Sequence, residues 1–308
     1  MKTFLRAAQT NTFVTGALLV LLGSVLVSTK AILVKLAYQY DIGMIALLSL
    51  RMLFSLPVFV LIAYRSWNRQ KGKLEGLTRK DWFKIALIGV MGYYLASMFD
   101  FLGLQYITAG LERLILFVYP TLVVLIVAFA GKKPIPGFQV KALLLTYLGI
   151  LLAFLENVLN NSSENILLGT VLVFGCALFY ALYIVGSSYY VAKTGSWLFT
   201  SIAMIAASGA VFLHQLTAGD QALGQFDWQV YALALTMSII ATILPTFMIS
   251  EGIRLVGASN AAIIGSVGPI STIILAYIFL GEQLGWIQIV GTGLVVAGVL
   301  AISLQKTT

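Results

Sequence analysis

The sequence predicts an all-α polytopic membrane protein whose ten transmembrane helices form two inverted five-helix repeats, with both termini in the cytoplasm. Three observations predict this fold class. The first is composition: 60% of the 308 residues are apolar and only 10% are charged, which leaves too little polar surface to cover a water-soluble fold. The second is a series of apolar runs separated by short polar loops. The third is the distribution of lysine and arginine among those loops.

The first half of the chain contains five apolar runs. A helix needs about 20 apolar residues to cross a hydrocarbon core of roughly 30 Å, and charged or turn-forming residues bound each run. The runs cover residues 14–37, 42–64, 83–105, 108–130 and 138–156. The first run follows Lys2 and Arg6, as a signal sequence would, but it is longer than a signal-sequence core, so we expect a retained helix.

A polar loop at residues 157–165 separates these runs from five more of similar character. The later runs cover residues 167–192, 197–216, 229–252, 257–280 and 284–304. We therefore expect one five-helix unit at residues 1–156 and a second at residues 157–308. The single cysteine, Cys176, lies inside an apolar run without a partner for a disulfide or a metal site, and is expected to be a buried core residue.

Positive charge alternates between successive loops, and loops rich in lysine and arginine stay in the cytoplasm. The segments assigned to the cytoplasm contain Lys2, Arg6, the basic segment 65–84, Lys132, Lys133, Lys141, Lys193, Arg254 and Lys306. The opposite segments contain Asp41, Glu164, Asp220, Asp227 and Glu282. Both termini are thus predicted in the cytoplasm, and the chain in a bacterial inner membrane as a multi-pass protein. The formal charge of +8 reflects this topology, because no basic soluble face exists for nucleic acid.

Proline and glycine spacing indicates an internal duplication. Gly103 and Pro120 are separated by the same distance along the chain as Gly252 and Pro269, and each pair is followed by an apolar stretch that ends near a glycine. Because each half holds an odd number of helices, the second copy has to insert upside down. Inverted repeats with a site between the halves near the bilayer midplane are a recurring transporter design.

With these features the chain resembles the drug/metabolite transporter superfamily, and specifically its EamA-like ten-helix branch, over essentially its whole length. The residues that carry the resemblance are Leu50-Arg51-Met52, the run at 110–120, Pro269 and Phe279-Leu280-Gly281-Glu282. The resemblance implies a central cavity lined by the first four helices of each half, with the fifth and tenth helices behind. It also implies transport of amino acids, nucleotide sugars, phosphorylated metabolites, amines or drugs. The two halves differ in charge at one corresponding position, where the first half has Gly131-Lys132-Lys133 and the second half has Gly281-Glu282.

Ionisable side chains inside apolar runs mark the candidate site, because each costs roughly 2.5–3.5 kcal/mol to insert unless it is paired or lines a wet pathway. These residues are Lys30, Lys35, Arg51, Asp100, Glu112 and Arg113. One interpretation is structural, with arginine and carboxylate pairs locking helices together; the other is contact with cargo. Four cations against two carboxylates leave a positive excess, which suits a carboxylate or phosphate on the cargo.

Within this set the first interpretation makes Asp100, Glu112 and Arg113 a coupling or charge network. The second makes Lys30 and Arg51 ligands of the cargo. Lys35 and Arg113 are near enough to the outer interface for their charged ends to reach it.

Polar and aromatic residues at helical spacing predict two faces of a cavity. The first carries Tyr93, Ser97 and Asp100, and the second carries Cys176, Tyr180, Tyr183 and Ser187. The substrate-binding set predicted from the sequence is therefore Lys30, Arg51, Tyr93, Ser97, Asp100, Tyr180 and Tyr183. Pro120 and Pro269 are predicted gating residues, because proline frees a backbone carbonyl and allows a helix to bend.

Other polar and small residues are expected to have structural roles. Glu251 and Arg254 are expected to form an interfacial pair, and His214 an interfacial ring. Gly291, Gly293 and Gly298 are expected to allow close packing of the last helix.

The predicted function is secondary transport, by alternating access, of a small polar metabolite such as an amino acid or another zwitterionic or anionic compound, in the direction of export. A multidrug or amine exporter of the same fold is the alternative within transport. An intramembrane enzyme such as a protease is the alternative from another class, but no HExxH motif or phosphate-binding loop is present. We expect no catalysis, cofactor, metal or nucleic acid. The expected partners are the bilayer, the substrate, a proton or counter-substrate, and a second copy in a homodimer.

Overall fold

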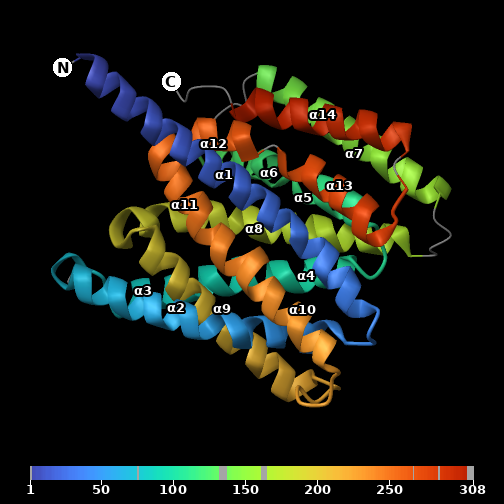
Figure 1. The fold of residues 1–308 in the computed structure, drawn as a ribbon, viewed down its shortest axis with the longest axis horizontal. Coiled ribbons are helices and arrows are strands. Elements are labelled where there is room, and N and C mark those ends of the chain that lie inside the picture. The colour runs from blue at the N-terminus through green and yellow to red at the C-terminus, as the bar shows by residue number, and fades with distance from the viewer. Residues whose placement is uncertain are drawn as a thin grey trace.

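The computed structural model describes residues 2–74, 76–131, 137–160, 165–265, 267–283 and 285–303, and within these ranges the fold is helical without strands (Figure 1). The helices of the first half are α1 (Lys2–Tyr38), α2 (Met44–Leu74), α3 (Arg79–Gly89), η1 (Val90–Leu95), α4 (Ala96–Gly103), α5 (Ala109–Leu116), α6 (Tyr119–Gly131) and α7 (Gly137–Asn160). The helices of the second half are α8 (Ile166–Thr194), α9 (Ser196–Ala218), α10 (Trp228–Ser238), η2 (Ile239–Ile243), α11 (Leu244–Val256), α12 (Ala258–Gly265), α13 (Val267–Leu280) and α14 (Trp286–Ser303).

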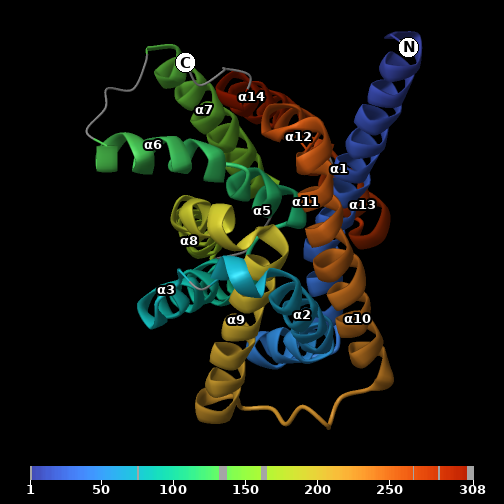
Figure 2. The same cartoon turned by 90° about the vertical axis from the view of Figure 1, so that its left-hand side faces the viewer.

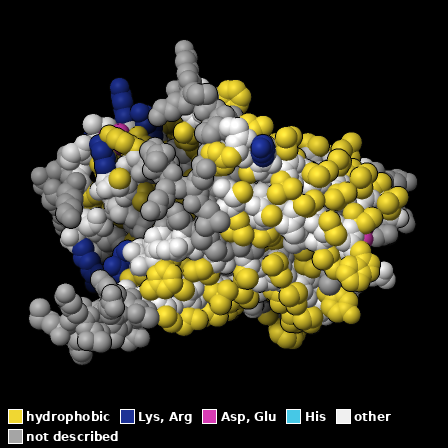
Figure 3. Space-filling model, turned by 90° about the horizontal axis from the view of Figure 1, so that it is seen from above, with side chains coloured by type: hydrophobic (Ala, Val, Ile, Leu, Met, Phe, Trp, Pro, Cys, Tyr) yellow, Lys and Arg dark blue, Asp and Glu magenta, His cyan; other side chains and the backbone are white. Residues whose placement is uncertain are grey.

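Seven helical segments among the described residues are long and apolar enough to cross a membrane. They are 12–38, 44–70, 79–103, 109–130, 166–194, 196–218 and 228–256, and α13 and most of α14 are shorter apolar helices. Figure 3 shows hydrophobic side chains over much of the surface, with most of the visible lysine and arginine gathered toward one end. The predicted class, a polytopic helical membrane protein, is therefore confirmed, whereas the count of ten transmembrane helices stays a prediction.

Two π-helical segments interrupt otherwise continuous helices, and the sequence did not predict them. η1 joins α3 to α4, and η2 joins α10 to α11, with right-handed helical backbone angles on both sides of each segment. A π-helical turn holds one extra residue in the turn, which changes the direction of the side chains beyond it, and such turns occur frequently at functional sites.

Glycines set the closest helix crossings. α1 packs against α11 where Gly16 meets Gly252, α4 against α8 where Gly103 meets Gly169, and α7 against α14 at Gly291. At each crossing, a methyl group on one glycine would press against a backbone carbonyl of the facing helix. Small residues allow this approach, which drives helix association in membranes.

The first helix of each half packs against helices of the other half. α1 packs against α11 and α13, while α8 packs against α4 and α6. η1 and η2 begin 149 residues apart, at Val90 and Ile239, and the same separation relates Pro120 to Pro269. In Figure 2 α7 and α14 lie together at one side, away from α2 and α9.

One of the two prolines predicted to act in gating follows an interruption between two helices. α5 ends at Leu116 and α6 begins at Tyr119, next to Pro120, whereas Pro269 lies in α13, which is described from Val267 onward. Proline is tolerated in the first turn of a helix because its missing N–H has no partner there.

The structure confirms two of the smaller expectations and corrects another. Cys176 is buried, and Arg254 forms an ion pair with Glu251 at 2.5 Å on an exposed helix face. Gly291 and Gly298 pack against α7, but a methyl group on Gly293 would meet nothing within 4 Å, so its predicted packing role is wrong. Gly291 and Gly293 are two residues apart and therefore point to different sides of α14. Their spacing in the sequence does not tell which side faces α7. Glu164, Lys132, Lys133 and Lys306 lie outside the described residues.

Candidate functional site

An ammonium shared by two carboxyls forms the centre of the candidate site. Lys30 Nζ on α1 lies 2.5 Å from Asp100 Oδ2 on α4 and 3.8 Å from Glu112 Oε1 on α5. Asp100 and Glu112 are fully buried, and the Lys30 side chain is 16% exposed. We refer to these three residues as the Lys30 cluster. Three ionisable groups of the set predicted from the sequence therefore form one ion-paired unit, in which a lysine takes the place of the expected arginine.

The short link between α4 and α5 brings the two carboxyls to the same depth. Asp100 lies one turn before the end of α4, and Glu112 lies in the first turn of α5. Thr108 caps α5 by accepting a hydrogen bond from the Leu111 amide at 3.2 Å, which fixes where the helix begins. On the opposite side, Ser28 of α1 donates to the Gly268 carbonyl of α13 at 2.9 Å and holds the Lys30 helix in place.

Arg51 lies beside the Lys30 cluster and is 4% exposed. Its Nη2 donates to Ser97 Oγ at 2.9 Å, and its guanidinium lies 5.0 Å from the ring centroid of Phe101. The Arg51 carbonyl accepts a hydrogen bond from Ser238 of α10 at 2.8 Å. Two of the predicted binding residues, Arg51 and Ser97, are therefore in direct contact, and the second half of the chain holds the backbone of one of them.

Arg113 points toward the second half of the chain. A methyl group on Gly268 would lie 2.8 Å from Arg113 Nη2, so glycine leaves room for the guanidinium between α5 and α13. Arg113 thus extends toward α13, and the expectation that its charged end reaches the membrane surface stays a prediction. Within the described part of the chain, the Nε atoms of Arg51 and Arg113 have no hydrogen-bond partner.

The predicted aromatic residues form a second group. The hydroxyls of Tyr93 and Tyr183 lie 3.0 Å apart, and the Tyr180 and Tyr183 rings stack with centroids 5.8 Å apart. Tyr119, next to the helix interruption, contacts Tyr180 edge to face at 5.0 Å. Gly92 in η1 leaves space for Tyr183. His214 lies outside this group, where its Nδ1 is 2.9 Å from the Tyr94 hydroxyl.

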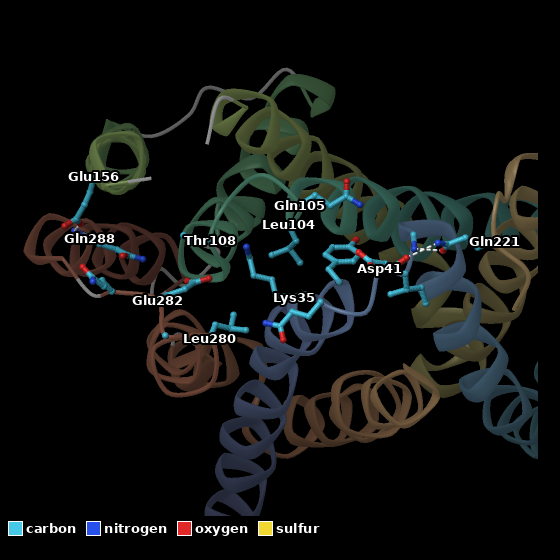
Figure 4. Close-up of a pocket in the computed structure, with 16 residues that line it drawn as sticks. Lys35, Asp41, Leu104, Gln105, Thr108, Glu156, Gln221, Leu280, Glu282 and Gln288 are labelled. Atoms are coloured by element: carbon cyan, nitrogen blue, oxygen red, sulfur yellow. Dashed lines mark hydrogen bonds between the residues drawn. The ribbon is translucent and has the colours of Figure 1, made fainter. Parts of the chain in front are cut away.

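A pocket of about 900 Å³ opens at the end of the molecule where α1 ends (Figure 4). Side-chain amides are the commonest polar groups in its lining, so we call it the amide-rich pocket. Its polar residues are Lys35, Tyr38, Gln39, Asp41, Gln105, Thr108, Glu156, Gln221, Glu282, Gln283 and Gln288. Figure 4 places Lys35 in the middle of the pocket, with Glu156 and Gln288 on one side and Asp41 and Gln221 on the other.

Two carboxylates of the pocket cap helices from the other half of the chain. Glu282, after α13, accepts hydrogen bonds from the amides of Ala109 at 2.8 Å and Gly110 at 3.2 Å, at the start of α5. Glu156 of α7 accepts from the Gln288 amide at the start of α14. A carboxylate at a helix N-terminus satisfies free amides and interacts favourably with the helix dipole. The mouth of the pocket is thus built from both halves.

The amide-rich pocket lies one helical turn from the Lys30 cluster. Leu104 and Thr108 line the pocket, and Asp100 and Glu112 lie four residues deeper on the same two helices, a rise of about 6 Å. The sequence did not identify Gln105, Glu156 or Gln288 as site residues. Glu156 and Gln288 do stand out as polar residues in or at the end of apolar runs, which is a signal that they are buried.

Comparison with known proteins identifies the family of this chain. The profile of the EamA-like transporter family matches residues 14–155 and again residues 167–304. The chain belongs to the EamA-like transporter family. This family forms part of the drug/metabolite transporter superfamily, so the resemblance given by the sequence motifs is confirmed, and the chain is a membrane transporter.

Relatives of this transporter match most of its length. The uncharacterized transporter YcbK of Bacillus subtilis is 32% identical over 284 residues, covering 90% of this chain and 89% of its own. The uncharacterized transporter sll1319 of Synechocystis is 24% identical, covering 97% and 96%. A solved crystal structure superimposes with a TM-score of 0.62 at 14% identity, covering 93% of this transporter and 95% of that chain, and so shares its fold.

Proposed function

We propose that this transporter carries a small polar metabolite with an acidic group, such as an amino acid or another zwitterionic or anionic compound. The observation that supports this cargo is the buried charge. Lys30, Arg51 and Arg113 outnumber the carboxylates Asp100 and Glu112 by one, because Lys35 lies apart in the amide-rich pocket. A buried positive excess is costly without an anion, and arginine and lysine bind carboxylates and phosphates well.

The proposed binding set places each part of the cargo. Lys30 and Arg51 take the acidic group, with Ser97 and Asp100 orienting them through the contacts described above. Tyr93, Tyr180 and Tyr183 pack against the body of the cargo, since stacked tyrosines combine apolar faces with polar edges. Asp100, Glu112 and Arg113 form the charge network that responds to occupancy.

We further propose that transport follows alternating access between two inverted five-helix repeats, residues 1–156 and 157–308, with ten transmembrane helices. The constant separation of 149 residues between matching features supports this arrangement, as does a family profile that matches the chain twice. Pro120, beside the interruption between α5 and α6, and Pro269, at the corresponding position of the second half, are the proposed gating residues. The gathering of visible lysine and arginine toward one end of the molecule in Figure 3 supports a cytoplasmic location for that end, and we propose cytoplasmic termini in a bacterial inner membrane. Export and a homodimer stay predictions.

One observation favours amine transport as a second candidate. Around Lys30 itself two carboxyls face a single ammonium, so an amine that displaced the Lys30 side chain would find two acidic partners. The two candidates differ in what they require of Lys30. Acidic cargo needs its positive charge, whereas cationic cargo competes with it.

Transport in proteoliposomes separates the candidates. Purified wild-type and Lys30→Met protein would be tested with a panel of amino acids, carboxylates, phosphorylated metabolites and amines. We expect Lys30→Met to abolish transport of the acidic cargo, with a melting temperature in detergent close to that of the wild type. Lys193→Met, an exposed lysine with its charge away from the site, is the matched control and should transport normally. Normal transport of acidic cargo by Lys30→Met would overturn the proposal, and increased amine transport would support the second candidate.

A further inference from the structure

The amide-rich pocket contains none of the residues in the proposed binding set. Its described lining belongs instead to the ends of α1, α7 and α13, the start of α14 and the links between helices. Its volume of about 900 Å³ lies within the range of roughly 300–1,000 Å³ that is typical of small-molecule sites. The pocket is therefore large enough for a ligand of its own.

Lys35 brings a positive charge without an ion-pair partner into the pocket. It lies in the last turn of α1, is half-buried, and occupies the middle of the pocket (Figure 4). The neighbouring Glu282 uses both carboxylate oxygens to cap α5, and Lys35 forms no ion pair within the described part of the chain. A half-buried ammonium has lost part of its hydration, so a carboxylate on a ligand would bind it favourably.

The side of the pocket that carries Asp41 is negative. The Asp41 residue is exposed, and its carboxylate forms no ion pair with a described residue. Asp220, outside the lining, lies near Gly43 and adds a second negative charge on this side. A positively charged group of a ligand is therefore attracted to the Asp41 side, away from Lys35.

Gln221 holds the link that carries Asp41. Its side-chain amide donates to the Asp41 carbonyl at 2.9 Å and accepts from the Gly43 amide at 2.6 Å. Gln215 of α9 donates in turn to the Gln221 carbonyl at 2.8 Å. Asp41 has a φ of 53°, in the left-handed region that aspartate and asparagine adopt more readily than most residues. The second half of the chain thus fixes the position of the negative side.

The other two charged residues of the described lining are already compensated. Glu156 and Glu282 cap α14 and α5, where helix amides and the helix dipole offset a negative charge. The charge that remains available is positive at Lys35 and negative on the Asp41 side. A ligand with one carboxylate and one ammonium matches this polarity. The second negative charge of a phosphate or dicarboxylate would instead face carboxylates, and like charges repel.

Uncharged amides complete the polar lining. A side-chain amide both donates and accepts hydrogen bonds, so it can bind the polar groups of a zwitterion without adding charge. Gly110 leaves room for one of these amides, because a methyl group there would be 2.4 Å from Gln288 Nε2. The others belong to Gln39, Gln105 and Gln283.

We propose that the amide-rich pocket is a second binding site of the transporter, and that its ligand is a small zwitterion such as an amino acid. Lys35 binds the carboxylate, and the Asp41 side attracts the ammonium. Binding in the pocket does not depend on the proposed function. The identity of this ligand with the cargo does rest on that function, and narrows the cargo from acidic compounds to zwitterions.

A cysteine in the pocket lining reports occupancy. Cys176→Ala removes the buried native thiol, and Gln283→Cys introduces an exposed one in the full-length transporter in detergent. The rate of maleimide labelling is measured with alanine and γ-aminobutyrate, which are zwitterions with short and long charge separation. Each zwitterion is matched by the acid and the amine of the same skeleton, which are propionate and ethylamine for alanine, and butyrate and propylamine for γ-aminobutyrate.

We expect at least one zwitterion to slow labelling of Gln283→Cys by about tenfold at a concentration about ten times its dissociation constant. Its matched acid and amine should protect much less. Arg79→Cys, exposed at the start of α3, is the control and should be labelled at the same rate with every probe. Protection by the acid as strong as by the zwitterion would overturn the zwitterion assignment, and labelling that no probe slows would overturn the site.

Charge variants in the Gln283→Cys background assign the two groups. Lys35→Met should raise the zwitterion concentration for half-protection by about tenfold or more, whereas Lys35→Arg keeps the charge and should retain protection, which separates loss of binding from unfolding. Asp41→Asn keeps a residue suited to positive φ, and should reduce protection by the zwitterion to that by its matched acid. Unchanged protection in Lys35→Met would overturn the role of Lys35.

Lys30→Met separates this site from the proposed function. It should keep full protection of Gln283→Cys, because Lys30 is not part of the pocket lining. Protection together with no transport of any acidic or zwitterionic cargo by the wild type would overturn the proposed function and leave the pocket site standing. Transport of acidic cargo that depends on Lys30, without protection by any probe, would overturn the pocket site instead.

Discussion

Arg51 makes its contacts through the shape of its guanidinium as well as its charge. The Nη2 donates to Ser97, and the plane lies over Phe101. A lysine would keep the charge, but it lacks the planar group that makes both contacts at once. A hydrogen bond from a charged group is worth about 1.5–3 kcal/mol, and a desolvated contact of a cation with an aromatic ring is worth up to about 2 kcal/mol.

We therefore expect Arg51→Lys to reduce the apparent affinity for cargo by about tenfold or more, since about 1.4 kcal/mol corresponds to that factor. The measurement is the concentration dependence of initial transport rates in proteoliposomes. Arg254→Lys keeps a charge on an exposed helix face and should leave the rates unchanged. Wild-type affinity in Arg51→Lys would show that only the charge at this position matters for transport.

The candidate residues were predictable from the sequence because an ionisable side chain in an apolar run is conspicuous. Lys30, Arg51, Asp100 and Glu112 were all found in this way. Their pairing was not predictable, because it depends on how α1, α4 and α5 approach one another. Whether Lys35 belongs to the same charge group depends on the same tertiary geometry, which places it in the amide-rich pocket instead.

At the scale of the helix, α7 and α14 pack along each other. Gly291 lies at their contact, where a methyl group would be 2.5 Å from the Gly149 carbonyl oxygen. Two residues further along the same helix, a methyl group on Gly293 would meet nothing within 4 Å. The pair therefore offers a matched comparison of the same substitution, on the same helix, with and without a facing backbone.

We expect Gly291→Ala to destabilise the transporter by about 1–3 kcal/mol, because an overpacked contact forces the helices apart. Gly293→Ala should be neutral or slightly stabilising, because alanine has the higher helix propensity. Melting temperatures in detergent, followed by loss of α-helical circular dichroism, provide the measurement. Equal melting temperatures for the two variants would contradict the described contact between α7 and α14.

The pattern of apolar residues predicted where the helices lie, but it predicted less well where they are interrupted. The expected run at 108–130 corresponds to α5 and α6 together, and Pro120 indicated irregularity within it. The interruption itself precedes the proline, because proline fits the start of the following helix. η1 and η2 left no such signal, since no residue type marks the extra residue of a π-helical turn.

At the scale of the whole molecule, fold class and family followed from features spread over many residues. Composition excluded a soluble fold, and the alternation of apolar runs gave the helices. The cargo did not follow in the same way. Its proposed binding region depends on a few contacts between distant segments, and the amide-rich pocket combines Lys35 of α1 with Glu282 after α13. No periodic pattern in the sequence indicates that two such distant residues lie in the same pocket.

Membrane orientation is a property of the whole chain and can be tested by single-cysteine labelling. Cys176 is buried and can be replaced by alanine to give a cysteine-free background. In that background, Asp220→Cys introduces an exposed thiol in the link between α9 and α10, and Arg79→Cys introduces one at the start of α3. The basic segment 65–84 is predicted to be cytoplasmic, so these two positions should lie on opposite sides of the membrane.

We expect a membrane-impermeant maleimide to label Asp220→Cys in intact cells, and to label Arg79→Cys only after the membrane is permeabilised. A control with both proteins in detergent should give equal labelling, because both positions are exposed in the structure. Labelling of Arg79→Cys alone in intact cells would reverse the orientation and place the amide-rich pocket on the cytoplasmic side.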